Sequence, residues 1–527
     1  MLGAVDPQAE LLDADQLCGH LVPKDSIHRK LAVLGDKLFT DADFSDLYDP
    51  GRGRHSVPPS LLAKVMLLQS LEGTSDREAV DRVRRDIGWK VALGLSLQDE
   101  GFHPTVLTYF RERLRRSDNP RRIFDRFKEV ATEAGLLTGR GVRVLDSTPV
   151  LSAVQTQDTV SLIRGAIRRL LRLLHKADPD ARAAIEADLA RDDYATVGKP
   201  AIDWDDERCR AALVDELVRD ALGALEVLEG KELSGDIADA AELLATVAGQ
   251  DVESDDDGNF RIRRGVARDR VVSVVDPDVR HGRKSRHGHF DGYKAHIAID
   301  PETELVTEVE VTPASTADAE PVKALLPELE ERRDPDDEMT VVADSAYGSG
   351  ATRRELRDAG VKTVIKALPE QNTRGGFPKS AFRIDLDAKA ATCPAGETTA
   401  TVASKKGGVV EFRFPAATCL TCPLHAQCTT STDARVGRRV KVGPHEKLLA
   451  EARAQQQTDE FKVVYNGKRP TVERVIYRVV RNCGRKARYR GRVKVTEQIR
   501  TKAAAENLVR MLRLGLVWTA EIGWATV

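Results

Sequence analysis

Two acidic residues far apart in the chain stand where a carboxylate could hold a metal ion. Asp146 and Asp344 each follow a short apolar run, in GVRVLDSTPV and MTVVADSAYG, which is typical of a buried strand, so we expect each acid at a strand end. A carboxylate in that position costs free energy unless a shared cation compensates it. Oxygen ligands suit Mg²⁺ or Mn²⁺, and a pair of such ions can assist in-line displacement at a phosphodiester. Taken singly, either aspartate could equally be a turn former.

Glu473 is the candidate for a third metal-binding carboxylate. Pro470 can open a helix at TVERVIYRVVRN, which would place Glu473 in the first turns, where the helix dipole tolerates negative charge. Counting by fours, Glu473, Tyr477 and Arg481 share one helical face. A metal-binding acid and a phosphate-binding guanidinium would then address the same cleft.

The segment around Glu473 is strongly basic. Residues 462–502 contain 14 Lys and Arg against two acids, a net charge of +12. This is the electrostatic pattern of a protein that binds the phosphate backbone of DNA, and a solvated helix face is the alternative. The predicted DNA-binding residues are Arg469, Arg481, Arg485, Lys486, Arg488, Arg490, Arg492 and Lys494.

Composition describes an ordinary water-soluble globular chain. Of 527 residues, 41% are hydrophobic and 31% charged, which excludes collagen-like, wholly disordered and membrane classes. The sequence has neither a run of about 18 uncharged apolar residues nor a signal-peptide pattern. We therefore expect a cytoplasmic protein without a membrane partner. Residues 186–257 carry 22 acidic and 6 basic residues, a net charge of −16, so this segment cannot form a DNA-contact surface.

The pattern of elements predicts an α/β fold in which a mixed sheet is flanked by helices. VVSVVD, YKAHIAID and LVTEVEVTP are expected to be successive strands, followed by a helix at AEPVKALLPELEERR and by strand and helix units. The expected organisation is an N-terminal helical domain (1–135), a first catalytic strand region (136–157), an acidic helical insertion (158–265), a core (266–370), a cysteine-bearing insertion (371–440) and C-terminal helices that complete the core (441–527).

The N-terminal domain is expected to contain several short helices. Ser75 and Glu78 have the spacing of a capping box, and Pro104 stands near the start of a helix that contains Arg111, Arg113, Arg115 and Arg116. Two alternatives stay open for these helices: a helix-turn-helix that reads DNA, or a plain helical bundle.

Four of the seven cysteines fall within one 36-residue stretch: Cys393, Cys419, Cys422 and Cys428. Four thiolates are enough for a tetrahedral structural Zn²⁺, and the alternative is four reduced thiols packed in a small subdomain. His425 is expected at the surface, and the other cysteines are expected to be ordinary thiols. His281, His287 and His289 fit a phosphate-contacting loop better than a metal site.

Several segments together resemble the insertion-sequence DDE transposases that have an InsH-type N-terminal helical domain. They are FSDLYDPGRGRHSVPPSLLAKVMLLQ, SDREAVDRVRRDIGWKVALGL, LDSTPV, DPDVRHGRK with DGYKAHIAID, ADSAYGS, CPAG with CLTCPLHAQC, and RPTVERVIYRVV with RKARYRGRVKV. The resemblance implies an RNase H-like catalytic fold. It also implies binding to terminal inverted repeats and metal-dependent cleavage and joining of DNA, with Asp146, Asp344 and Glu473 as the triad.

The family's Tyr, Arg, Glu, Lys signature is matched only approximately, by Tyr465, Arg469, Glu473 and Arg481. The first and last gaps are each one residue longer than in the family, which puts the duties of Tyr465 and Arg481 in doubt. Because two DNA ends must be joined, a dimer or larger assembly on DNA is expected. The rival hypotheses are an RNase H-like nuclease that does not transpose DNA and a catalytically silent DNA-binding regulator.

Overall fold

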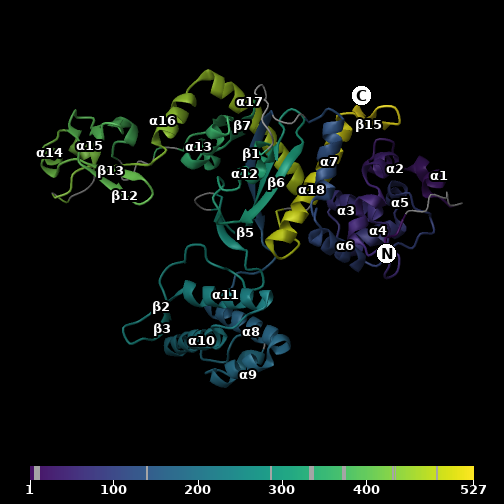
Figure 1. Cartoon of the computed structure of the whole chain (residues 1–527), viewed down its shortest axis with the longest axis horizontal. Helices are drawn as coiled ribbons and strands as arrows, with labels where there is room; N and C mark the ends of the chain where they lie inside the picture. Colours follow the sequence, from purple (N-terminus) through teal and green to yellow (C-terminus); the bar gives the residue numbers. More distant parts are fainter. Residues whose placement is uncertain are drawn as a thin grey trace.

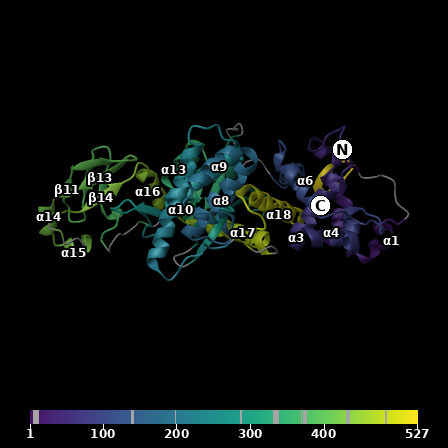
Figure 2. The same cartoon turned by 90° about the horizontal axis from the view of Figure 1, so that it is seen from below.

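The computed structural model describes residues 1–4, 12–137, 141–196, 198–284, 288–330, 338–368, 370, 376–429, 433, 435–481 and 485–527. Figure 1 shows a mixed sheet in the middle of an elongated molecule, with the N-terminal helices at one end and the cysteine-bearing segment at the other. Helices α8 to α11 project to one side of the sheet (Figures 1 and 2). The class is therefore mixed α/β, as predicted.

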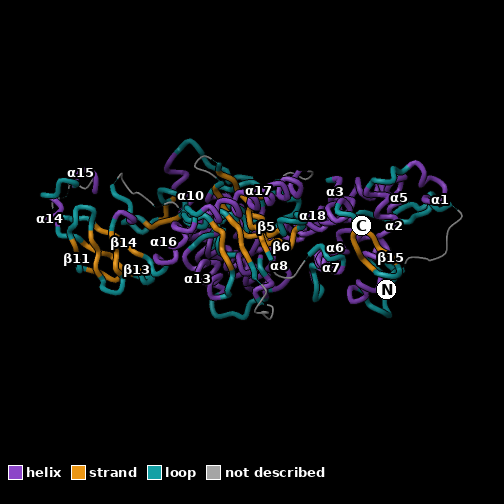
Figure 3. The backbone as a smooth tube through the Cα atoms, turned by 90° about the horizontal axis from the view of Figure 1, so that it is seen from above, coloured by secondary structure: helices purple, strands orange, loops and turns teal. Residues whose placement is uncertain are grey.

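The central sheet has six strands. Its order is β4-β5-β1-β7-β8, and β6 pairs with β5 on the side away from β1. β5 runs antiparallel to β1 and β6, whereas β7 and β8 run parallel to β1. Figure 3 shows the strands of this sheet in orange between helices. The strands are β1 (Val142–Leu151), β4 (Arg280–Arg283), β5 (His289–Ile299), β6 (Val306–Pro313), β7 (Thr340–Ala343) and β8 (Lys362–Ile365).

Two predicted elements differ in the structure. The run VVSVVD, residues 271–276, is not a strand; its valines instead pack against the sheet and against α8. The helix predicted over 319–333 is reduced to α12 (Val322–Leu325) and the 3-10 turn η4 (Pro327–Leu329). Pro327 has no N–H to continue a helix, which explains the early end. Residues 331–333 lie outside the described part of the chain.

The N-terminal region is helical as expected. In α4 the Ser75 hydroxyl accepts from the Glu78 N–H while the Glu78 carboxylate accepts from the Ser75 N–H, which confirms the capping box. The helices are α1 (Ala14–Cys18), α2 (Ile27–Leu38), α3 (Pro59–Glu72), α4 (Asp76–Arg85), α5 (Ile87–Leu93), α6 (Thr105–Arg116) and α7 (Arg122–Glu133).

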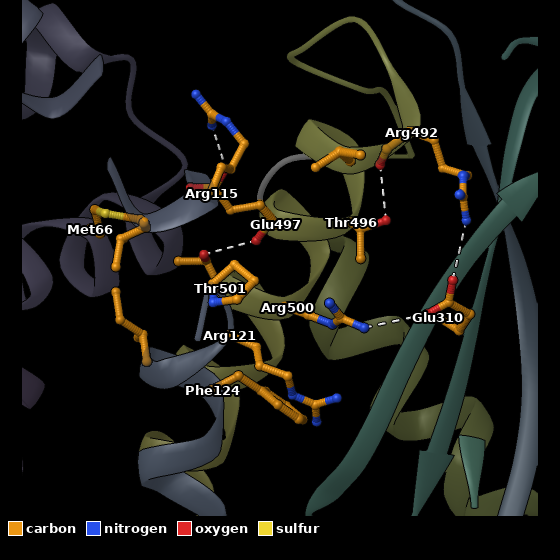
Figure 4. A pocket seen from close by; sticks show the side chains of 14 residues that line it. Met66, Arg115, Arg121, Phe124, Glu310, Arg492, Thr496, Glu497, Arg500 and Thr501 are labelled. Carbon is orange, nitrogen blue, oxygen red and sulfur yellow. Dashed lines mark hydrogen bonds and ion pairs between the residues drawn. The ribbon is translucent and has the colours of Figure 1, made fainter. Parts of the chain in front are cut away.

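Two long C-terminal helices join these parts. α17 (Asp459–Arg481) packs across the sheet, and α18 (Arg492–Arg513) lies between the sheet and helices α3 and α7. One continuous hydrophobic cluster includes residues of the N-terminal helices, the sheet, α17 and α18. A cavity of about 220 Å³ lies at this junction. Figure 4 shows its lining, in which Met66 of α3 and Arg115 of α6 face Glu497 of α18. The N-terminal helices and the sheet are thus parts of one packed body.

The helices that follow β1 have a core of their own. They are α8 (Thr159–Ala177), α9 (Pro179–Asp188), α10 (Glu207–Leu228) and α11 (Gly235–Gln250), and their buried residues form a separate hydrophobic cluster. A short hairpin of β2 (Val252–Ser254) and β3 (Phe260–Ile262) ends this segment.

The cysteine-bearing segment contains two small antiparallel sheets, β11-β10-β9 and β12-β13-β14, and two single-turn helices. It leads through α16 (Glu446–Gln455) to α17. The bounds are β9 (Arg383–Asp385), β10 (Ala390–Thr392), β11 (Thr398–Thr399), β12 (Val402–Lys405), β13 (Val409–Arg413), β14 (Arg439–Val442), α14 (Ala416–Leu420) and α15 (His425–Cys428). No helix in the described part of the chain is long and apolar enough to cross a membrane.

Candidate active site

Asp146 and Asp344 occupy corresponding positions on neighbouring parallel strands. Leu145 of β1 pairs with Ala343 of β7, and each aspartate is the next residue. Leu145 and Ala343 belong to the hydrophobic cluster on one face of the sheet. Because side chains alternate along a strand, the two acids point to the opposite face, about 5 Å apart at the backbone. The structure therefore brings Asp146 and Asp344 together.

The position of Asp146 in its strand was predicted wrongly. β1 does not end at Asp146 but continues to Leu151, paired with β5 throughout. Asp344 does follow the end of its strand, where its carboxylate caps the turn η5 (Ser345–Tyr347) by accepting the Ala346 N–H at 3.0 Å.

The electrostatic environment couples the two acids. Burial raises the pKa of Asp146 above its ordinary value, Arg469 and the Ser147 N–H oppose this, and the neighbouring charge of Asp344 raises the pKa further. Two adjacent carboxylates in a partly buried place require a compensating cation.

Helix α17 supplies that cation and brings in the third acid. The Arg469 Nη2 lies 2.9 Å from Asp146 Oδ2, and its Nη1 lies 3.6 Å from Glu473 Oε1. Asp146 and Arg469 are 16% and 11% exposed at their side chains, whereas Glu473 is 68% exposed. Tyr465, one turn before Arg469, is buried and stacks on Phe461.

Glu473 is in the middle of its helix, and this corrects the prediction that Pro470 begins the helix. α17 starts at Asp459 and passes through Pro470. The helix dipole acts only near the termini, so it does not stabilise Glu473. The nearest compensating charge for this acid is Arg469.

A third residue stands in line with the two strand acids. Ala343 of β7 pairs with Ile365 of β8, so Lys366 follows β8 as Asp344 follows β7. The Lys366 ammonium lies 4.6 Å above the centre of the Tyr465 ring. The sequence analysis missed this residue, although its place directly after the apolar run VKTVI was a usable signal.

Buried hydrogen bonds on the reverse face of the sheet fix the strand ends. His296 of β5 bonds to the Tyr347 hydroxyl at 2.9 Å and to Thr312 at 3.0 Å. Burial lowers the pKa of His296 to about 4, so the ring is neutral near pH 7. Tyr347 belongs to the turn that Asp344 caps, and its bond to His296 restrains the Asp344 backbone.

Asp146, Asp344 and Glu473 offer the oxygen donors that divalent cations bind, but their side chains do not surround a common point. Among the described residues, no three His, Cys, Asp or Glu side chains are grouped so as to hold a metal ion. Three carboxylates against one guanidinium leave an excess of negative charge, which suits a hard divalent cation. Arg469 Nε and Nη1 and the Thr148 hydroxyl are buried and have no hydrogen-bond partner within the described ranges. Such atoms mark a place where a ligand is expected.

The predicted DNA-binding residues fall into two groups. Arg469, Arg481, Arg488 and Arg492 contact Asp146, Glu506, the carbonyls of residues 73 and 74, and Glu310, respectively. The other four are exposed and have no ion-pair partner in the described part of the chain: Arg485, Lys486, Arg490 and Lys494. Two further cations of this segment, Arg474 and Arg478, are bound to Glu304.

Helix α6 does not present its arginines as a recognition helix would. Arg111 is buried and bound to Asp76 and Gln69, and Arg115 is bound to Glu497 of α18. Arg113 lies over the Tyr48 ring. Arg111 and Arg115 therefore serve packing, whereas Arg113 and Arg116 are exposed, and both alternatives for this helix remain predictions.

The four clustered cysteines line one pocket, together with His425. Burial raises the pKa of Cys428; Arg438 opposes this, and the nearby Cys419, Cys393 and Cys422 raise it further. His425 is half-buried and bonds to the Cys419 carbonyl at 2.7 Å, so only part of this histidine is at the surface. The predicted phosphate loop contains three histidines. His281 pairs with Asp291 at 2.5 Å, and His287 lies outside the described residues. Cys483 also lies outside them.

Two protein families match parts of this chain. Residues 17–113 match the transposase domain DUF772, and residues 392–512 match a transposase DDE domain. These matches support an insertion-sequence DDE transposase. The first matched region contains α2 to α5 with parts of α1 and α6, and the second contains the four clustered cysteines, α17 and nearly all of α18. No curated protein and no solved structure matches this chain.

The matched DDE region begins at residue 392, so it contains Glu473 and Arg469 but neither Asp146 nor Asp344. Within the described residues, the folded sheet and α17 bring the two strand acids beside the matched region. The matched families are transposase domains, which suggests DNA as a partner.

Proposed function

We propose that this chain cleaves DNA at the ends of a mobile element and joins the freed 3'-hydroxyl to target DNA. The observation that carries the proposal is the convergence of Asp146, Asp344 and Glu473 around Arg469, in a chain with two transposase-family matches. The exposed cations near the C-terminal end of β1 support the same function, because they would bind the phosphate backbone.

The sheet topology supports an RNase H-like assignment for the core. Three antiparallel strands in the order β6-β5-β1 continue into the parallel strands β7 and β8. We propose that this sheet with α17 and α18 forms the catalytic domain. The segment 158–265 and the cysteine-bearing segment 371–440 are then insertions into it, and residues 1–135 form the N-terminal domain.

The acids are proposed to hold Mg²⁺ or Mn²⁺, which would supply charge neutralisation at the scissile phosphate and lower the pKa of a bound water. Asp146 and Asp344 are the inner pair, since burial and register fix their positions. Glu473 is the exposed member, on the side from which DNA approaches. Arg469 balances the charges of Asp146 and Glu473.

Joining two ends requires two active sites, so we propose a dimer or larger assembly on DNA. Residues 485–491, between α17 and α18, together with the first turn of α18, are proposed as the principal DNA-contacting segment. Arg488 bonds to the Gly73 and Thr74 carbonyls, which links this loop to the N-terminal helices.

The proposal is tested with DNA that carries the two ends of the element, by measuring nicking and strand transfer with Mg²⁺. Asp344→Asn removes one negative charge while keeping the shape of the side chain. We expect it to lower cleavage by roughly a hundredfold or more. Asp358→Asn is the matched control, because Asp358 is the exposed last residue of α13 (Gly350–Asp358) and pairs with Arg354 of the same helix.

Three outcomes separate the hypotheses. Cleavage followed by strand transfer, lost in Asp344→Asn and kept in Asp358→Asn, supports a transposase. Cleavage without strand transfer would indicate a non-transposing nuclease. DNA binding without cleavage in the unaltered chain would indicate a silent regulator.

A further inference from the structure

Four cysteine side chains converge in the segment between β10 and β14. Cys393 follows β10, Cys419 is in α14, Cys422 is in the turn after it, and Cys428 ends α15. All four are free thiols, all are half-buried, and all line one pocket of about 30 Å³. Convergence from four separate positions onto one small space is what a metal site requires.

This segment has little else to hold it together. Its hydrophobic cluster contains six fully buried residues, and Cys393, Cys419 and Cys428 pack against that cluster. Figure 1 shows the segment at the far end of the molecule, joined to the rest through α16. A unit of this size with so small a core is normally stabilised by disulfides or by a metal.

Backbone contacts around the sulfurs fit a metal ligand. The Arg438 N–H donates to the Cys419 sulfur at 3.3 Å, a bond that stabilises a thiolate. The backbone just before Arg438 lies very close to the backbone of Phe414, since a side chain on Gly437 would lie 2.0 Å from the Phe414 carbonyl oxygen.

We propose that Cys393, Cys419, Cys422 and Cys428 bind one structural Zn²⁺ that stabilises this segment. Within the described residues the sulfurs line the pocket without closing on a common point, so the proposed binding requires the cysteine side chains to turn towards the ion about their single torsion. Each thiol loses its proton to solvent when it binds. His425 is a positioning residue: one ring nitrogen is used on the Cys419 carbonyl, and four thiolates already complete a tetrahedral site.

The test is elemental analysis of the full chain, purified without chelator from medium that contains zinc. We expect about one zinc per chain. Cys422→Ser should lose at least most of it, whereas Cys209→Ser, a cysteine of α10 bonded to Asp206, should keep it. His425→Gln should also keep it. Zinc-free wild-type protein, or equal zinc in wild type and Cys422→Ser, overturns the proposal.

A second measurement uses the wild-type chain, so it tests the proposal even if the serine variant does not fold. Cobalt replaces zinc in the wild-type chain, and the intensity of the thiolate-to-cobalt absorption reports the sulfur ligands. Four-sulfur absorption supports the site, and an absorption without thiolate bands overturns it. Neither measurement uses DNA, so its outcome is independent of the proposed transposition.

A different observation carries a second inference, which rests on the proposed function. Asp146, Asp344 and Lys366 follow matched positions on the three parallel strands β1, β7 and β8. Lys366 is exposed, and the described residues include no carboxylate paired with it. We infer that Lys366 binds the DNA phosphate beside the scissile bond and positions the strand for cleavage.

Lys366→Gln tests this role. We expect about tenfold slower cleavage, with recovery in Lys366→Arg. Lys362→Gln is the matched control, because Lys362 is exposed at the other end of β8 and pairs with Glu460. A methylphosphonate, which removes the charge of that one phosphate, should slow wild type but leave Lys366→Gln nearly unchanged. If wild type cleaves and Lys366→Gln cleaves equally fast, the role of Lys366 is wrong while the proposed function stands.

Discussion

Arg469 of α17 contacts Asp146 of β1 through its Nη2 at 2.9 Å, and the same guanidinium reaches Glu473 through Nη1 at 3.6 Å. One cation thus stands between a strand acid and the helix acid. Because burial and the charge of Asp344 both raise the pKa of Asp146, Arg469 is the main group that keeps this carboxylate ionised.

Removing Arg469 should therefore change the pH dependence of cleavage. A carboxylate acts as a metal ligand only when ionised, so cleavage is lost as pH falls through the pKa of Asp146. In Arg469→Gln that pKa rises further, and we expect the acidic limb of the rate profile to move up by about one pH unit. Arg474→Gln is the control, since Arg474 lies on the same helix but pairs with Glu304. Coinciding acidic limbs in wild type and Arg469→Gln would contradict this account.

The strand and helix pattern of the core could be predicted from the sequence, but the ends of two elements could not. β1 continues past Pro149 because its pairing with β7 stops at Leu145, so one side of the later part has no partner strand and tolerates a residue without an N–H. α17 continues past Pro470 because Phe461 and Val472, on either side, are buried against the sheet and in the core. Tertiary packing decided both cases, and no local signal reports it.

The candidate acids were named correctly from their surroundings in sequence, but the use of the basic residues was not. Net charge predicts a DNA surface without saying which cations are already paired. Arg474 and Arg478 bind Glu304 in the turn between β5 and β6, a contact across about 170 residues of sequence. Only the folded chain separates such structural cations from the exposed Arg485 and Arg490.

Glu304 should anchor α17 to the sheet. Its carboxylate accepts from Arg474 at 2.6 Å and from Arg478 at 2.7 Å, and its side chain is 10% exposed. We expect Glu304→Ala to lower the free energy of unfolding by about 2 kcal/mol, because both ion pairs are lost. The loss is not larger because Arg474 can be rehydrated. Glu304 has a φ of 56°, so Glu304→Gly should be about 1 kcal/mol less destabilising than alanine. Urea unfolding measures both, and equal stability of the two variants would contradict the backbone argument.

The exposed cations between α17 and α18 should control DNA binding through charge alone. We expect the double variant Arg485→Gln/Arg490→Gln to weaken binding of every DNA sequence similarly. The slope of log affinity against log salt should fall by about two. Lys231→Gln, an exposed cation within the acidic segment, is the control and should leave the slope unchanged. Titrations at several salt concentrations make the measurement, and a sequence-dependent loss would indicate base contacts instead.

Arg115 of α6 joins two glutamates whose titrations should affect stability in opposite directions. Burial raises the pKa of Glu497 above 4.5, although Arg115 and Arg111 oppose this, whereas the hydrogen bond from Arg115 lowers the pKa of exposed Glu112. A raised folded-state pKa means that Glu497 contributes stability below about pH 4.5, which is lost as pH rises through its folded value. Glu112 contributes stability above that range, which is lost as pH falls.

Unfolding by urea at about pH 5 and about pH 8 compares these two groups. Glu497→Gln cannot ionise, so its stability relative to wild type should be greater at the higher pH than at the lower. Wild-type Glu112 is ionised in both states over most of this range, so Glu112→Gln, the matched variant on the same arginine, should show the reverse trend only when the series is extended down to about pH 3. Because both changes are isosteric, packing around the cavity in Figure 4 stays the same. If both variants follow wild type in parallel, the burial of Glu497 between α6 and α18 does not govern its titration.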